Sequence, residues 1–236
     1  MPAGEGRPPP FERGSDGGWW FARWASRRVM AGVSGRHVDL QRWLGRLPAP
    51  RATVEAEQVH GASVAIIEGT ARSLPPIAGC DALLTAIPGA SLMIRSADCL
   101  PVFFADPLRG VVGIAHAGWR GLAGLVLARV VAAFRHSIHT RAEELYVAIG
   151  PSIRACCYEV GPEFASRFGP FVHEQAGRRM CDLPGVAKDQ LRRCGVSPAR
   201  VLDSQRCTGC EPQEWFSLRR EGAATGRLIS LIMLRP

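Results

Sequence analysis

The feature that most constrains the fold is a series of short strand-like runs between residues 53 and 115. Each run is rich in β-branched and other apolar residues, and Gly, Pro or Asp separates it from the next. The five predicted strands cover residues 53–59, 63–67, 91–96, 100–105 and 111–115. Together they predict a sheet.

Helical spacing follows directly after the last of these runs. Apolar residues of segment 121–134 recur every three or four positions, so a strand that ends near His116 is expected to turn through Gly118 and Gly121 into a helix. Further strands are predicted at 145–149 and 227–234, and helices at 39–47, 162–168 and 186–193. The rest of segment 19–47 has no clear period. Strands followed by helices indicate an α/β fold.

Length and hydropathy together predict one domain. The chain has 236 residues, of which 47% are hydrophobic, enough for one substantial core. Residues 1–18 carry Pro, Gly and charge where a secretory signal would need an apolar stretch, so we predict a flexible tail there and a single catalytic domain at 19–236. The apolar run 122–134 contains Arg129 and falls short of the roughly 18 residues of a membrane span. A cytoplasmic protein without membrane contact is expected.

Charge and cysteine content narrow the classes of partner. The net charge of +8 comes almost wholly from scattered arginines, with Lys188 as the only lysine. This pattern does not predict a nucleic-acid partner, although it is compatible with a phosphate-bearing or purine-like ligand. The eight cysteines are irregularly spaced, which favours thiols or metal ligands over a disulfide framework. Cys207 and Cys210 form one CxxC without a second pair, so a structural role is predicted there.

Three candidate metal ligands, His60, Cys99 and His116, lie where predicted strands meet turns. Zinc binds imidazole nitrogen and thiolate in tetrahedral geometry. Three protein ligands leave a position for water, whose pKa falls to about 7. The spacing matches no short zinc motif. From the residues alone, two core histidines and a small buried cysteine therefore remain an alternative.

Seven successive segments resemble the signature blocks of the YfiH/LACC1 family, in the family's order and from residue 58 to the C-terminal region. They are QVHG, DALLT, SADCLPVFFADP, GIAHAGWRGLAGLV, AIGPSIRACCYEVG, CTGCEP and WFSLRREGAATGR. The resemblance implies a layered α/β/β/α fold with mixed sheets and zinc held by His60, Cys99 and His116. It also implies a zinc-dependent purine nucleoside phosphorylase that deaminates adenosine and cleaves methylthioadenosine, in a family first described as multicopper polyphenol oxidase or laccase. Purine nucleosides and phosphate would be its substrates.

Four neighbouring residues are further candidates. Arg120 offers a planar set of donors suited to phosphate or developing charge. Arg95, on the predicted strand that leads to Cys99, is a second candidate for binding an anionic substrate. Asp98 could orient an imidazole or transfer a proton as a catalytic group. Trp119 could stack on a purine. Ion pairing for the arginines, a loop contact for Asp98 and core packing for Trp119 are the structural alternatives.

The residues are also compatible with other functions. Cys99 and His116 could form the nucleophile and base of a metal-free cysteine hydrolase or deamidase. The family's N-terminal TTRxGGVSxG block is represented here only by AGVSG at 31–35, and its Asn-Leu pair is absent, so a non-catalytic purine-binding protein is a further hypothesis. Editing of peptidoglycan precursors is another. Copper could replace zinc in vitro, and a monomer or small homo-oligomer is expected.

Overall fold

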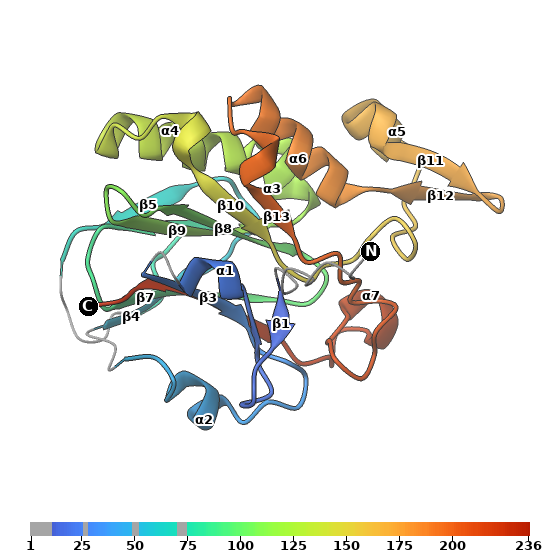
Figure 1. Cartoon of the computed structure of the whole chain (residues 1–236). Helices are drawn as coiled ribbons and strands as arrows, with labels where there is room; N and C mark the ends of the chain where they lie inside the picture. The colour runs from blue at the N-terminus through green and yellow to red at the C-terminus, as the bar shows by residue number, and fades with distance from the viewer. Residues whose placement is uncertain (1–10, 26–27, 49–51, 70–74) are drawn as a thin grey trace, which may run out of the picture.

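Two six-stranded mixed sheets lie face to face in the computed structural model, which describes residues 11–25, 28–48, 52–69 and 75–236 (Figure 1). The β14 sheet has the order β1 (Glu12–Arg13), β2 (Trp19–Trp20), β3 (Val29–Val33), β14 (Leu228–Leu234), β7 (Ala90–Ser96) and β4 (Ala52–Glu55). The β9 sheet has the order β13 (Val201–Asp203), β10 (Tyr146–Ile149), β8 (Leu100–Asp106), β9 (Val111–Ala117), β6 (Ala82–Thr85) and β5 (Val64–Ile67). Both sheets are mostly antiparallel, with parallel pairing at one edge of the β14 sheet and at both edges of the β9 sheet.

Helices cover the outer face of each sheet. The β9 sheet is covered by α3 (Trp119–Ala123), α4 (Val126–Ile138) and α6 (Leu183–Arg193), and the β14 sheet by α2 (Leu40–Leu44) (Figure 1). The remaining elements are α1 (Ala22–Ala25), α5 (Glu163–Phe168), α7 (Leu218–Glu221) and the hairpin of β11 (Val172–Gln175) and β12 (Arg178–Cys181), with 3-10 turns at Ala142–Glu144, Gly169–Phe171 and Pro198–Arg200. The predicted α/β/β/α layering is therefore confirmed.

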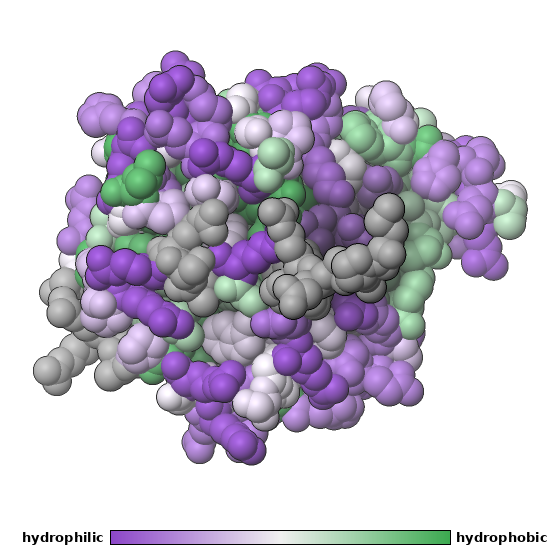
Figure 2. Space-filling model, in the orientation of Figure 1, coloured by the Kyte–Doolittle hydropathy of each residue, from purple (hydrophilic) through white to green (hydrophobic). Residues whose placement is uncertain are grey.

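The central strands are apolar on both faces because each sheet is covered on both sides. In β8, Val102 and Phe104 face the helix layer, while Phe103 and Ala105 face the other sheet. The outward faces of α4 and α6 are largely hydrophilic, and so is the projecting β11–β12 hairpin, whereas hydrophobic residues gather around and below α5 at the right of the view (Figure 2). Within the described ranges, no helix combines the length and the apolar character needed to cross a bilayer.

The prediction that five strands form a single sheet is wrong. Strands β4 and β7 belong to the β14 sheet, whereas β5, β8 and β9 belong to the β9 sheet. The cause is that fully buried strands give continuous apolar runs, which identify a strand without identifying its neighbours.

Three predicted elements also have different bounds in the structure. The strand predicted over 53–59 ends at Glu55, since Gln58 and His60 have φ of 63° and 58°, values outside the β region. The helix predicted over 121–134 is divided into α3 and α4, because Leu125 has φ of 61°. The predicted helix over 39–47 is shorter, with Asp39 capping the N-terminus of α2.

Residues 11–18 belong to the fold and not to the predicted tail, whose residues 1–10 lie outside the described ranges. Strand β1 pairs with β2, and Phe11 is buried against Trp19, Phe21 and Trp215. The sequence did not predict strand β1 or the burial of Phe11, because a single aromatic residue among Pro, Gly and charged residues does not form a periodic pattern.

We predict that Phe11→Ala lowers the free energy of unfolding by about 3–5 kcal/mol, because it removes a buried aromatic ring and leaves a cavity. Urea unfolding measures the change. Leu108→Ala is the control, since Leu108 is 86% exposed and its loss should change stability by no more than about 0.5 kcal/mol. Equal values for the two variants would contradict the packing of residues 11–18.

Candidate metal centre and its flanking clefts

His60, Cys99 and His116 converge although they come from three separate parts of the chain. His60 lies between β4 and β5, Cys99 lies in the turn that carries the chain from β7 to β8, and His116 lies on β9. Their ligand atoms are all within 4.8 Å of one another. His116 is buried, Cys99 is half-buried and His60 is exposed, so the cluster runs from the core to solvent. These three residues could therefore hold one metal ion with a side accessible to solvent.

Asp81, at the start of β6, holds two of the three candidate ligands. One carboxylate oxygen lies 2.9 Å from His116 Nδ1 and accepts the backbone N–H of His60 at 3.0 Å. The other accepts the backbone N–H of Gly61 at 2.7 Å. Because Nδ1 of His116 is engaged by Asp81, Nε2 is directed to the cluster. A carboxylate in this position fixes the ring orientation and increases the basicity of the imidazole.

Strained backbone surrounds the cluster. Gln58, His60 and Asp98 all have positive φ, which costs non-glycine residues of order 1–3 kcal/mol each. Hydrogen bonds offset this cost. The side chain of Gln58 pairs with both backbone groups of Arg95 on β7, at 2.6 and 2.7 Å, as a neighbouring strand would. Such strain is common where a fold positions functional side chains.

Gly118 leaves the room that the cluster needs. A Cβ atom at this position would lie 2.9 Å from Cys99 Sγ and 3.5 Å from His60 Cδ2. The first distance is shorter than a van der Waals contact, so a larger residue would displace the sulfur. This is a physical reason for glycine in the HAGWRG segment.

The thiol and imidazole of the cluster favour a charged pair. Burial raises the pKa of Cys99, but hydrogen bonds with His116 and His60 outweigh burial and lower this pKa to about 7. Burial likewise lowers the pKa of His116, but its contacts with Asp81 and Cys99 raise it to about 9. A thiolate is the form of cysteine that binds metals and acts as a nucleophile.

Two clefts meet at the cluster, and both are lined by His60, Cys99 and Leu218 of α7. The Arg95 cleft, of about 370 Å³, is also lined by Glu55, Glu57, Gln58, Arg95, His116 and Arg227. The Trp119 cleft, of about 390 Å³, is also lined by Asp98, Trp119, Arg120, Tyr158 and Arg219. A ligand could therefore reach the cluster from two sides, one of them partly aromatic.

Asp98 does not take the orienting role predicted for it. Its carboxylate accepts hydrogen bonds from Thr208 Oγ1 at 2.6 Å and from the backbone N–H of Arg219 at 2.7 Å, and no contact with either imidazole is present among the described residues. The imidazole partner is instead Asp81. The sequence signal for Asp81 was its position as the first residue of the DALLT block. Asp98 fixes the segment before Cys99 against α7.

The other three predicted residues, Arg95, Trp119 and Arg120, line the clefts and also contact other side chains. The guanidinium of Arg120 lies over the Trp119 ring at 4.4 Å, and the ring also packs against Phe164 at 5.2 Å. A purine could stack on Trp119 only if Arg120 moved. Arg95 pairs with Glu55, which agrees with the structural alternative for that residue.

Tyr158 and Arg219 are site residues that sequence reasoning missed. Tyr158 lines the Trp119 cleft, and burial raises the pKa of its phenol to about 12, so it stays a neutral donor. The guanidinium of Arg219 lies 5.0 Å from the Tyr158 ring. The sequence signal that could have identified Tyr158 is its place after Cys157 in the AIGPSIRACCYEVG block.

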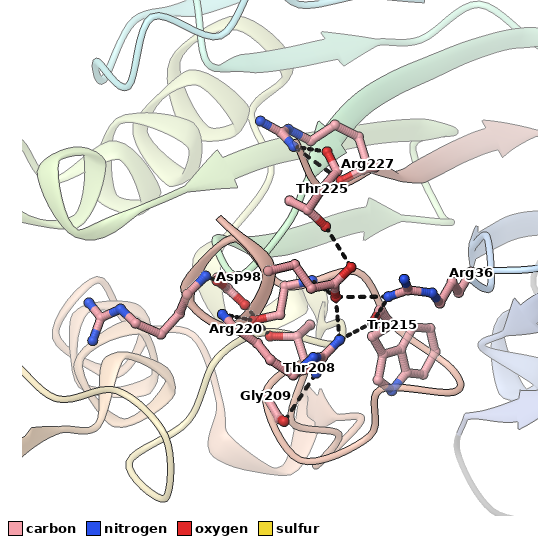
Figure 3. A network of polar contacts seen from close by, with 12 residues as sticks. Arg36, Asp98, Thr208, Gly209, Trp215, Arg220, Thr225 and Arg227 are labelled. Carbon is pink, nitrogen blue, oxygen red and sulfur yellow. Dashed lines mark hydrogen bonds and ion pairs between the residues drawn. The ribbon is translucent and has the colours of Figure 1, made fainter. Parts of the chain in front are cut away.

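The AGVSG segment is connected through Arg36 to α7, which lines the Trp119 cleft. Arg36 donates a 2.8 Å hydrogen bond to Glu221 at the end of α7, and Arg220 contacts the same carboxylate (Figure 3). These contacts lower the pKa of Glu221 to about 2. Arg36, which directly follows the AGVSG segment, therefore supports the helix that carries Leu218.

The stacked mixed sheets and the His-Cys-His cluster at the meeting point of two clefts define a layered α/β/β/α protein with a candidate mononuclear metal centre. The chain belongs to the multi-copper polyphenol oxidoreductase laccase family, whose model matches residues 33–235.

Named relatives and solved structures agree with this assignment. The purine nucleoside phosphorylase YlmD of Geobacillus stearothermophilus is 35% identical over 208 residues, which cover 82% of this chain and 75% of the relative. The adenosine deaminase RL5 of an unknown prokaryotic organism is 33% identical, with 74% and 72% covered. The crystal structure of YlmD matches with a TM-score of 0.87 at 29% identity, covering 97% of this chain and all of that one. These relatives support an enzymatic role.

We predict that Asp81→Asn reduces zinc affinity by about 10- to 100-fold, because the amide no longer supplies the negative charge that supports His116. Competition with a chromophoric chelator measures the affinity. Asp39→Asn is the matched control, since asparagine caps a helix as well as aspartate does. An unchanged affinity in Asp81→Asn would show that the carboxylate does not support a metal ligand.

The pKa values predict how Cys99 reacts in protein stripped of metal by a chelator. Its alkylation rate should rise through a midpoint near pH 7, because the thiolate is the reactive form. In His116→Ala the midpoint should move upward, since burial remains and the imidazolium is lost. Mass spectrometry of the labelled peptide follows Cys99 separately. A wild-type midpoint near 9 would contradict the charged pair.

Proposed function

We propose that the protein is a zinc-dependent purine nucleoside phosphorylase that also deaminates adenosine and cleaves methylthioadenosine. The observation that carries the proposal is the meeting of two imidazoles and one thiolate at the junction of two clefts. The names of the relatives supply the substrate class: purine nucleoside phosphorylase for several and adenosine deaminase for one. Phosphate and a purine nucleoside would approach the cluster through the two clefts.

The donor set favours zinc over a blue-copper centre. Two imidazoles and a thiolate suit both metals, but blue-copper sites add a weak axial ligand, most often methionine. Among the described residues, no methionine lines either cleft. Both clefts leave space beside the three ligands, as a catalytic zinc site requires.

When bound, zinc would supply positive charge that polarises a reacting oxygen and lowers the pKa of water. The chain's own residues would do the remaining work. Asp81 holds His116 and the backbone of His60 in place. Arg120, at the mouth of the Trp119 cleft, binds phosphate or steadies developing charge, and Asp98 keeps the Cys99 segment against α7. Phosphorolysis requires attack at C1′ of the nucleoside and deamination requires attack at the purine C6, so the two substrates would bind in different positions.

A second candidate function rests on the charged Cys99–His116 pair. A thiolate beside an imidazolium is also the resting state of cysteine hydrolases, in which Cys99 would attack a carbonyl and His116 would protonate the leaving group. That chemistry needs Cys99 free of metal. The two candidates therefore differ in metal content and in the exposure of one sulfur.

Hypoxanthine release from inosine, with and without phosphate, tests the proposal in protein purified without chelator. We expect phosphate-dependent release in the wild type, its loss in His116→Ala and Cys99→Ala, and the loss of one zinc equivalent in each variant. His173→Ala is the control, because His173 is exposed on β11. A wild type that lacks metal at the cluster and is alkylated rapidly at Cys99 would support the hydrolase. Inosine binding with zinc present and no product would indicate a non-catalytic protein.

A further inference from the structure

The CxxC at Cys207 and Cys210 is not alone, contrary to its appearance in the sequence. The turn that follows β10 brings the adjacent Cys156 and Cys157 beside it. The sulfur atoms of all four cysteines lie within 4.8 Å of one another. Cys156 Sγ is 3.4 Å from the sulfurs of both Cys207 and Cys210, and Cys157 Sγ is 3.4 Å from that of Cys210.

These distances fit four ligands of one ion. Zinc binds thiolate sulfur at about 2.3 Å, so the sulfurs of a tetrahedral site lie roughly 3.8 Å apart. Cys156 is equally close to two partners, which does not single out one disulfide pairing. Ordinary packing is also a poor explanation, since free cysteines usually pack as small buried hydrophobes, whereas Cys156 and Cys210 are exposed.

The loop around the cluster has features that a thiolate site needs. A Cβ atom on Gly209 would lie 2.7 Å from Cys157 Cβ and 2.8 Å from its sulfur, so glycine lets the two segments approach. Backbone groups of Cys210 and Gly209 hydrogen-bond to the sulfur of Cys207. Arg220, which is paired with Glu221, donates to the carbonyl oxygens of Thr208 and Gly209 at 2.6 and 3.1 Å and so holds the loop in place (Figure 3).

We propose that Cys156, Cys157, Cys207 and Cys210 bind a second zinc ion, with a structural role, separate from the His60–Cys99–His116 cluster. Four protein ligands close the coordination sphere, which is typical of structural and not of catalytic zinc. The ion would hold the loop whose Thr208 donates to Asp98, the residue before Cys99 (Figure 3). It would also fix the turn that precedes Tyr158 in the wall of the Trp119 cleft.

Zinc analysis of the full chain, purified with reductant and without chelator, tests this proposal without any nucleoside assay. We expect two zinc ions per chain in the wild type, one in Cys210→Ser and one in His116→Ala. Cys194→Ser is the matched control and should keep two, since Cys194 belongs to neither cluster. One zinc ion per chain in the wild type, absent from His116→Ala, would overturn the proposal.

Cobalt substitution tests whether the four cysteines bind a metal ion even if Cys210→Ser does not fold. The His116→Ala protein should bind one Co²⁺ with the intense bands of a tetrahedral tetrathiolate site. Absence of these bands, or a mass lower by the four hydrogens of two disulfide bonds in reductant-purified protein, would show that the cysteines are not metal ligands. These results do not depend on whether the protein acts on nucleosides.

Discussion

The carboxylate of Asp81 is the interaction on which the candidate metal centre depends. It is fully buried and contacts the His116 ring together with the backbone of His60 and Gly61. A buried carboxylate is costly unless it is paired and hydrogen-bonded. Here the groups that compensate for burial of the Asp81 carboxylate are the His116 ring and the backbone N–H groups of His60 and Gly61. The same hydrogen bonds therefore stabilise the buried carboxylate and hold two candidate ligands in position.

The architecture explains why the centre lies where it does. The turn after β7 carries the chain from the β14 sheet to the β9 sheet, and Cys99 lies in that turn. His116, near the end of β9, pairs directly with Pro101 at the start of β8. The site is therefore built where the two sheets are joined. A cluster of polar contacts around α7 supports the wall of one adjoining cleft (Figure 3). Four cysteines meet beside the loop that contains Thr208.

Much of the fold, and the three residues that converge at the candidate metal centre, could be predicted from the sequence. Buried strands such as β8 and β9 are continuous apolar runs, and the motif blocks around His60, Cys99 and His116 are specific. The sheet to which each strand belongs could not be predicted, because apolar runs contain no information on partners. Strand β3 was missed in a segment without a clear period. The role of Asp81 and the approach of Cys156 to Cys207 both depend on contacts between residues distant in sequence.

We propose that one metal ion is bound by His60, Cys99 and His116 and remains open to solvent. A crystal structure of the metal-loaded protein, with anomalous scattering collected on both sides of the zinc absorption edge, tests it most directly. We expect a zinc peak bonded to the two imidazoles and the thiolate, with its fourth position facing the clefts. An empty cluster in protein that carries zinc elsewhere, or side chains that point away from one another, would contradict it.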